Sequence, residues 1–307
     1  MSLMFTSNFY YNNMYTKINN EVVNNNNNKS NTVKTQLVKK QLVKKQFVKK
    51  ELVKKESSDI LISSSELFNS INGAKVNRNK NIIPKYVFQT WKDKMMYPDM
   101  KNNLIKLRQQ NKEFTFFLYD DAMCREFIKT HFNHDVLNAF DTLIPGPFKA
   151  DLWRYCILYV YGGVYMDIKI NCINGFRLNN IIHEECFPRD IPHGQKGVWQ
   201  GFLICKPENE ILKKCIDVIC MHVKFKFYGS TFLSVTGPHL VYNILTKYKK
   251  TFYYNQSKMK LVKKSFIVYL YYNNKPVFNF YTKWEDDKKK MGVRYSVLWR
   301  QKKIYKI

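Results

Sequence analysis

Two acidic and two basic side chains, of types that can bind polar or phosphorylated ligands, stand near one another in the chain. Asp151 and Arg154 are three residues apart, so a helix would place them on one face. A carboxylate accepts hydrogen bonds from sugar hydroxyls, and a guanidinium group suits phosphate oxygens. Asp167 and Lys169 follow a Gly-Gly pair and a short apolar run. The alternative for Asp151 and Arg154 is a surface ion pair of the kind that helices commonly carry.

The residues around this group predict the elements that position it. An apolar helical run precedes Gly162 and Gly163, and glycine tolerates the left-handed conformation that ends many helices. Residues 164–166 favour a buried strand that delivers Asp167 to its carboxyl end. In open α/β sheets, ligands bind at that edge. If Asp167 and Lys169 lie on one extended strand, their side chains face the same side.

Strand and helix patterns alternate from residue 81 onward. Strands are expected at 85–89, 114–119, 198–205, 266–272 and 277–281, and helices at 101–110, 122–131, 135–142, 208–223 and 238–248. Asp99 is the expected cap of the first of these helices. This alternation predicts an α/β fold with a mostly parallel sheet flanked by helices.

Two segments resemble the motifs of a family of sugar transferases. Residues 149–169, KADLWRYCILYVYGGVYMDIK, are similar to its hallmark "aDlwRyxiLyxyGGxYxDxD", and residues 83–91, IPKYVFQTW, to its opening "IPKxIHQxW". The family has a GT-A, Rossmann-like fold and includes the yeast-type initiating α-1,6-mannosyltransferases and the α-1,4-galactosyltransferases. The resemblance extends over residues 83–299. It implies transfer of a hexose or hexosamine from a nucleoside diphosphate sugar to a glycan or protein acceptor, with retention.

The resemblance also implies which residues bind the donor. Asp151, Arg154, Asp167 and Lys169 match the catalytic motif. Further donor-binding candidates are Gln89, Trp91, Asp120, Asp121, Gln200, Thr236, Gly237, Ser296 and Trp299.

Several candidates have a structural alternative. Trp91 either stacks on the base or packs in the core. Asp121 either reaches the donor or caps the following helix. Thr236 and Gly237 either help to bind an anion at a helix N-terminus or form a plain cap. Trp299 falls where relatives carry a lid that closes on the diphosphate.

The DxD motif departs from the family pattern at its second acid, where this chain has Lys169. Relatives use these carboxylates to bind Mn²⁺ or Mg²⁺, which prefer hard oxygen ligands. No His stands where the lid would supply a further ligand. Three interpretations are open: Asp167 forms a partial metal site, Lys169 replaces the cation, or Lys169 points elsewhere. We expect weakened or absent dependence on metal.

The N-terminal part has a different composition. Residues 36–55 contain four pentapeptides of the type QLVKK, and residues 34–55 have nine Lys against one Glu. A five-residue period places no single apolar stripe on a helix. We therefore expect a low-complexity basic extension and linker over 1–80 and a GT-A domain over 81–307. The extension is either a mobile tail or an electrostatic tether to an anionic membrane or polymer.

The charge and the cysteine content indicate which binding partners and which cellular compartment to expect. Outside the basic repeats, the rest of the formal charge of +27 is spread along the chain without one dominant basic motif, so no specific nucleic-acid partner is expected. Abundant Lys, Asn, Tyr and Ile suit an AT-rich genome, such as that of a large DNA virus. Seven Cys without a C-x-x-C pair favour a reducing compartment over a disulfide framework.

The expected location follows from the absence of targeting signals. The sequence has neither an apolar run of 18 residues nor a convincing signal peptide, so we expect a protein of the cytoplasm or of a host-cell virus factory. The rival to an active transferase is a catalytically inactive GT-A-fold protein that binds a nucleotide sugar or an anionic partner.

Overall fold

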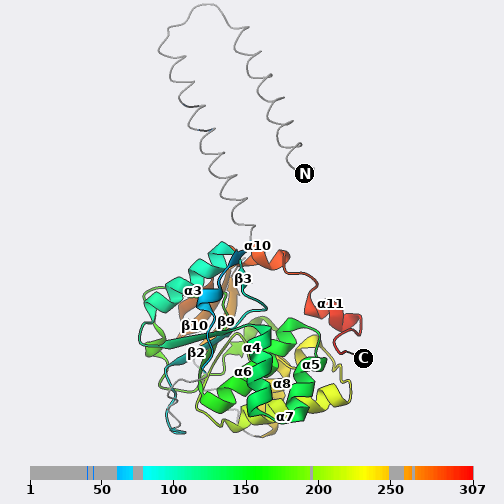
Figure 1. The fold of residues 1–307 in the computed structure, drawn as a ribbon. Helices are drawn as coiled ribbons and strands as arrows, with labels where there is room; N and C mark the ends of the chain where they lie inside the picture. Colours follow the sequence, from blue (N-terminus) through cyan, green and yellow to red (C-terminus); the bar gives the residue numbers. More distant parts are fainter. Residues whose placement is uncertain are drawn as a thin grey trace, which may run out of the picture. The chain divides into compact units, whose positions relative to one another are not determined.

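The computed structural model describes residues 40, 44, 61–71, 79–193, 196–248, 259–264 and 267–306. The chain forms two compact units, Met1–Ser57 and Ser58–Ile307. Of the pentapeptide repeats only Lys40 and Lys44 are described, so the predicted basic extension lies largely outside the described residues. The second unit contains all the predicted site residues (Figure 1).

A four-stranded sheet of order β4-β2-β5-β8 forms the base of the predicted site. Its strands are β4 (Thr115–Tyr119), β2 (Tyr86–Thr90), β5 (Gly163–Met166) and β8 (Phe202–Cys205). The first three strands run parallel, and β8 runs antiparallel to β5. Trp91, Asp120 and Asp167 each follow a parallel strand directly, so they emerge at one edge of the sheet.

The backbone between α6 (Gly146–Tyr161) and β5 requires the pair Gly162 and Gly163, the second of which begins β5. Gly162 has φ +63°, and a Cβ there would lie 2.6 Å from the backbone nitrogen of Pro207. Gly163 has φ +99°, and a Cβ there would lie 2.8 Å from the carbonyl oxygen of Tyr86. Glycine adopts these angles without steric cost, so the pair ends the preceding helix and lets β5 approach β2.

Helices cover one face of this sheet (Figure 1). They are α4 (Asp121–His131), α5 (His134–Thr142), α6 (Gly146–Tyr161), α7 (Glu210–Lys224) and α8 (Pro238–Lys247). Phe88, Tyr165 and Leu203 of the sheet pack into this helical layer. Residues 151–158 of α6 are all buried, so the predicted site helix lies within the core and its polar residues need internal partners.

The other face carries α3 (Pro98–Gln110) and a five-stranded sheet of order β6-β11-β10-β9-β7. Its strands are β6 (Ile170–Cys172), β11 (Lys275–Phe280), β10 (Ile267–Tyr272), β9 (Met259–Lys264) and β7 (Arg189–Asp190). The remaining elements are β1 (Ile62–Ser63), β3 (Met95–Met96), α10 (Trp284–Lys289), α11 (Tyr295–Arg300) and the short 3₁₀ turns Ser65–Leu67, Leu178–Asn180, Ile191–His193 and Phe232–Ser234.

The predicted α/β fold, with a mostly parallel sheet flanked by helices, is confirmed in the four-stranded sheet. The largely antiparallel second sheet was not predicted as a separate layer. The strand expected at 198–205 is shorter and begins at Phe202. Asp99 lies in the first turn of α3 and is not its cap, which is Tyr97.

Residues 61–71 belong to the second compact unit, which differs from the boundary predicted near residue 80. Leu67 and Ile71 are buried against it. The Asn69 amide donates a 2.8 Å hydrogen bond to the carbonyl oxygen of Phe116. This short segment carries enough apolar surface to pack, although its composition is that of a linker.

Two further features concern the environment of the protein. No helix in the described part of the chain has both the length and the apolar character needed to cross a membrane. All seven Cys are free thiols, and all but Cys220 are buried.

Candidate active site

The predicted pair of Asp151 and Arg154 forms a buried ion pair near the carboxyl edge of the sheet. One oxygen of Asp151, Oδ1, lies 2.9 Å from Nη1 of Arg154, and their side chains are only 11% and 7% exposed. This burial excludes the alternative of a surface ion pair. Burial raises the pKa of Asp151, an effect that Arg154 and Thr236 oppose.

Both terminal nitrogens of the Arg154 guanidinium contact protein groups, whereas its buried Nε has no hydrogen-bond partner among the described residues. Nη1 also donates to the carbonyl oxygen of Gln200 at 2.7 Å, and Nη2 donates to the Tyr165 hydroxyl at 3.2 Å. Its Nη2 lies 3.9 Å from Oδ1 of Asp167. Burial opposes the charged form, but Tyr165 and the two carboxylates outweigh burial and raise the pKa of Arg154. Arg154 therefore joins Asp151 to Asp167.

Thr236 and Gly237 complete the surroundings of Asp151. The Thr236 hydroxyl donates a 2.7 Å hydrogen bond to Oδ2 of Asp151. A Cβ on Gly237, the N-cap residue of α8, would lie 3.1 Å from the same oxygen. The N-terminus of α8 thus faces a carboxylate of the protein itself, which its dipole favours.

Asp167 and Lys169 lie in a turn and not on the extended strand considered above. β5 ends at Met166, and the amide of Ile170 donates to the carbonyl oxygen of Asp167 at 3.0 Å. The two side chains nevertheless meet, because the Lys169 ammonium contacts Oδ2 of Asp167. Tyr165 donates to the other oxygen at 2.8 Å. Burial opposes ionisation, but Lys169 and Arg154 lower the pKa of Asp167.

The residues near Asp167 do not fit the divalent metal that a DxD motif implies. Mn²⁺ and Mg²⁺ need several oxygen ligands. No group of three or more His, Cys, Asp or Glu that could bind a metal occurs among the described residues. Lys169 occupies the position of the second acid and contacts one oxygen of Asp167, and Tyr165 binds the other.

Gln89 lies near the end of β2, and Trp91 follows this strand directly, at the predicted nucleoside site. Gln89 is fully buried, and both polar atoms of its amide lack a hydrogen-bond partner among the described residues. The Trp91 indole donates to the carbonyl oxygen of Met95 at 2.9 Å, and its ring packs at the margin of an apolar cluster around α3. Of these two side chains, Gln89 is thus the one whose polar atoms lack a partner among the described residues.

Asp120, and not Asp121, caps the helix that follows the second strand. Oδ1 of Asp120 accepts a 2.8 Å hydrogen bond from the amide of Met123. Asp121 is half-buried. Burial raises the pKa of Asp121, and the charge of Asp120 adds to the effect.

The side chain of Gln200 is used inside the protein. Its Oε1 accepts a 2.7 Å hydrogen bond from the Tyr155 hydroxyl, and its Nε2 donates to Val198. Tyr155 also approaches the carbonyl oxygen of Thr236 at 2.9 Å. Tyr155 was missed by the sequence analysis. Its position one helical turn after Asp151 could have indicated it, since residues four apart share a helix face.

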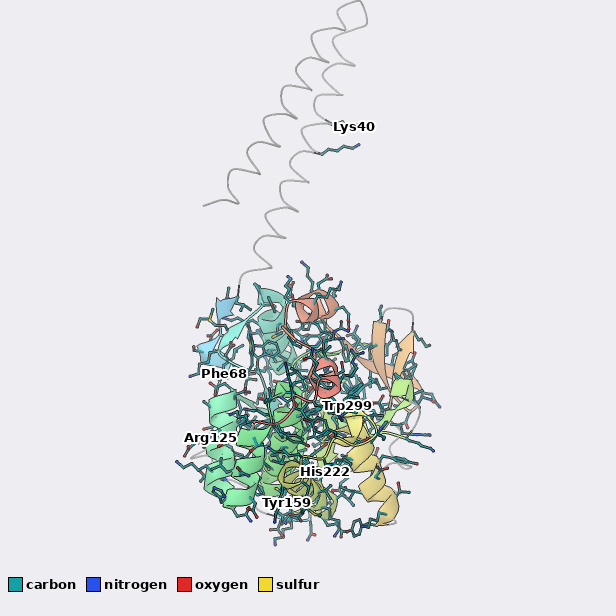
Figure 2. All side chains as sticks on the ribbon, turned by 90° about the vertical axis from the view of Figure 1, so that its right-hand side faces the viewer. Lys40, Phe68, Arg125, Tyr159, His222 and Trp299 are labelled. Atoms are coloured by element: carbon teal, nitrogen blue, oxygen red, sulfur yellow. The ribbon has the colours of Figure 1, made fainter. Side chains whose placement is uncertain are left out.

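Helix α11 carries Ser296 and Trp299, and Figure 2 labels Trp299 on the ribbon. The Trp299 indole donates to the carbonyl oxygen of Tyr228 at 2.6 Å, and among the described residues no polar contact places Ser296 in the site. Tyr295, which was not predicted, packs between Phe148 and Phe232. Burial and the nearby carboxylates, Asp151 foremost, raise the pKa of Tyr295 to about 12. α11 therefore borders the buried acids.

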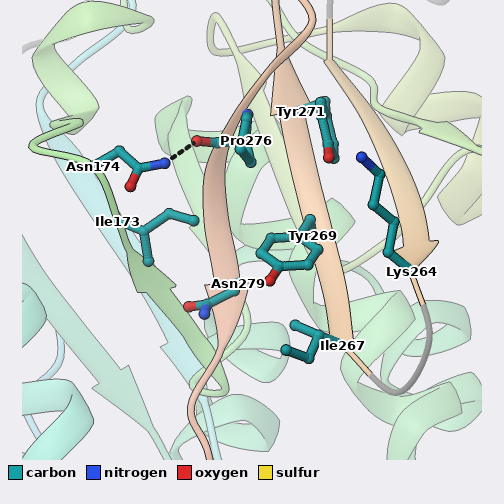
Figure 3. Close-up of a pocket in the computed structure, with 8 residues that line it drawn as sticks. All are labelled: Ile173, Asn174, Lys264, Ile267, Tyr269, Tyr271, Pro276 and Asn279. Atoms are coloured by element: carbon teal, nitrogen blue, oxygen red, sulfur yellow. Dashed lines mark hydrogen bonds between the residues drawn. The ribbon is translucent and has the colours of Figure 1, made fainter.

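A hollow of about 600 Å³ lies apart from these residues, on the second sheet. It is lined by Ile173, Asn174, Lys264, Ile267, Tyr269, Tyr271, Pro276 and Asn279 (Figure 3). None of the predicted site residues lines it.

The family model and the relatives that match this chain carry the names of glycosyltransferases. Residues 74–188 match the family described as "Glycosyltransferase sugar-binding region containing DXD motif". Inositol phosphoceramide mannosyltransferase 3 of Schizosaccharomyces pombe is 27% identical over 169 residues, which cover 55% of this chain and 46% of the relative. The chain thus spans about half the length of this curated relative.

Two shorter matches bear on the predicted resemblance. The initiation-specific alpha-1,6-mannosyltransferase of Candida albicans is 31% identical over 91 residues, 28% of this chain and 24% of the relative. Uncharacterized glycosyltransferase L373 of Acanthamoeba polyphaga mimivirus is 30% identical over 95 residues, 30% of this chain and 37% of the relative. The predicted resemblance to a family that includes the initiating mannosyltransferases is confirmed.

Proposed function

We propose that the protein is an active hexosyltransferase, because residues 74–188 match the model of the glycosyltransferases with a DXD-containing sugar-binding region. It transfers a hexose or hexosamine from a nucleoside diphosphate sugar to a glycan or glycoprotein acceptor, with retention of configuration. The names of the yeast relatives favour mannose as the sugar. The observation that carries the proposal is the buried network that joins Asp151, Arg154 and Asp167.

In this proposal the sugar is bound by Asp151. A carboxylate offers about four acceptor positions, and Arg154 and Thr236 use two of them. The remaining positions accept hydrogen bonds from sugar hydroxyls. Arg154 acts as a positioning residue, because its donors are directed to Asp151, Gln200 and Tyr165.

The nucleoside and the diphosphate would lie along the same edge of the sheet. The unpartnered amide of Gln89 supports a polar contact to the nucleoside, with Trp91, Asp120 and Asp121 beside it. Lys169 and the α11 lid, with Ser296 and Trp299, face the diphosphate. A positive charge fixed near the leaving group stabilises the charge that develops there in the transition state.

Thermal unfolding in the presence of nucleotide sugars tests this function. The panel contains GDP-mannose, UDP-glucose, UDP-galactose and UDP-N-acetylglucosamine, and a bound donor should raise the melting temperature by mass action. The same donors are then followed for release of free sugar without acceptor. Binding with sugar release supports a transferase. Binding without release supports the inactive binding protein, and no binding contradicts both.

We propose that the protein acts in the cytoplasm or in a host-cell virus factory. The support is the mimivirus relative and the Lys- and Asn-rich composition. The basic repeats would attach it to an anionic membrane or polymer. Imaging of the tagged protein in infected or transfected cells tests this placement.

A further inference from the structure

The ammonium group of Lys169 lies within an aromatic cage formed by Trp199, Phe280 and Trp284. Its Nζ is 5.7 Å from the ring centre of Trp199, 5.1 Å from that of Phe280 and 5.3 Å from that of Trp284. The Lys169 side chain is 17% exposed. Aromatic faces attract a cation at such distances, and the attraction is greater where water is excluded.

Three separate segments of the chain build this cage. Trp199 precedes β8, Phe280 ends β11, and Trp284 begins α10. The rings of Trp199 and Phe280 are stacked at 6.1 Å, and Trp284 meets Phe280 edge-on at 6.4 Å.

The backbone ties the cage to the turn that carries Lys169. The amide of Tyr281 donates to the carbonyl oxygen of Lys169 at 2.9 Å, and the amide of Trp284 donates to that of Tyr281 at 2.9 Å. The end of β11 and the start of α10 are thereby fixed next to Lys169.

The local charge of this arrangement equals that of a metal-bound DxD pair. Two aspartates with a divalent ion have a net charge of about zero. Asp167 with Lys169 also has a net charge of zero, because the acid-to-lysine replacement adds two positive charges. The ammonium contacts Oδ2 of Asp167 and the Tyr165 hydroxyl donates to Oδ1, so protein groups contact both oxygens of this carboxylate.

We propose that Lys169 is the resident cation of this site and that Trp199, Phe280 and Trp284 are positioning residues that direct it toward the diphosphate. The inference rests on the proposed function, and it assigns a donor site that works without a divalent metal. An ammonium group donates up to three hydrogen bonds. One is used by Asp167 in the free protein, which leaves others for phosphate oxygens.

Calorimetric titration with GDP and with UDP tests this inference, in EDTA and in excess Mn²⁺. The variants are Lys169→Ala, Lys169→Asp, Trp284→Leu and the control Lys264→Ala. Lys264 also lies over an aromatic ring, 5.1 Å from that of Tyr271, but in the hollow on the second sheet (Figure 3). Binding of Mn²⁺ to each free protein is measured by electron paramagnetic resonance.

The wild type should bind at least one nucleotide with an affinity that EDTA changes less than about twofold. Lys169→Ala should lose about 10- to 100-fold in both buffers, as expected for a lost charge-assisted contact. Trp284→Leu should weaken binding in both buffers while Lys264→Ala does not. Lys169→Asp should gain measurable Mn²⁺ binding and a nucleotide affinity that rises with Mn²⁺.

Two results would overturn the inference. One is wild-type nucleotide binding that EDTA abolishes while Lys169→Ala binds normally. The other is no binding of either nucleotide in any buffer. Release of sugar from a donor is measured separately. If the nucleotide binds as expected and no sugar is released, the proposed transfer fails and the assignment of Lys169 stands.

Discussion

Thr236 and Asp151 are 85 positions apart in the chain, and the Thr236 hydroxyl donates a 2.7 Å hydrogen bond to the Asp151 carboxylate in the core. Both side chains are buried. Because a buried carboxylate requires partners, this bond and the Arg154 ion pair together make an ionised Asp151 tolerable at this position. The loop before α8 thus contacts the Asp151 carboxylate through Thr236.

Thr236→Val should weaken donor turnover while preserving the fold. Valine has nearly the same shape but cannot donate to Asp151, and a hydrogen bond to a charged group contributes about 1.5–3 kcal/mol. The expected loss in kcat/KM is therefore about 10- to 100-fold. Thr236→Ser should retain most activity. Thr246→Val, which removes a 2.6 Å bond to the backbone of Tyr242 on the same helix, is the matched control.

Gln89→Leu should lower the affinity for nucleotide without lowering the free energy of unfolding. Both polar atoms of this buried amide lack partners, so a similar apolar side chain should leave the free energy of unfolding unchanged or raise it. Nucleotide affinity should fall, because the amide is then unavailable to the nucleoside. Urea unfolding and calorimetry measure the two effects. A clear loss of stability with unchanged nucleotide affinity would assign Gln89 to the fold alone.

Asp121→Asn should stabilise the protein at neutral pH. Burial and the charge of Asp120 raise the pKa of Asp121, so the folded state binds this proton more tightly than the unfolded state. The wild type therefore loses stability as the pH rises from about 4 through the raised pKa. The variant lacks this loss, so its advantage should vanish below about pH 4. Urea unfolding at both pH values measures the difference. An equal difference at acidic and neutral pH would contradict this account.

Two N-terminal truncations test where the folded unit begins. A chain that starts at Ser58 should fold and bind donor like the full chain, because the compact unit begins there. A chain that starts at Asn81 should be less stable, since it lacks the buried Leu67 and Ile71 and the Asn69 hydrogen bond. Thermal unfolding of both compares them. Equal stability would favour the boundary predicted from composition.

The sequence predicted the elements whose patterns are local. The β–α alternation, the helix ended by Gly162 and the buried strand before Asp167 agree with the structure, with shifts of a few residues at the ends. These features depend on periodicity and on the backbone freedom of glycine, which neighbouring residues determine.

The long-range partners could not be predicted. The aromatic cage joins segments around Lys169, Trp199 and Phe280, and no local pattern indicates that they meet. Gln200 was predicted as a donor-binding residue from the sequence, and its amide binds Tyr155 and Val198. Such pairings depend on how helix α6 packs on the sheet. A turn at Asp167 also stands in place of the extended strand that was considered for Asp167 and Lys169, because β5 ends at Met166, as predicted, and the Ile170 amide bonds to the carbonyl oxygen of Asp167.

Hydrolysis of the donor by wild type and Asp151→Asn tests the central claim most directly. The donor is the nucleotide sugar that gives the largest thermal shift, and released sugar is measured without acceptor. Asparagine keeps the shape of Asp151 but cannot supply a charged acceptor to the sugar. The account predicts a loss in turnover of at least about 100-fold, roughly 3 kcal/mol at the transition state, with an unchanged melting temperature for the free protein within a few degrees. Unchanged turnover in a normally folded Asp151→Asn variant would remove Asp151 and Arg154 from the site and contradict the account.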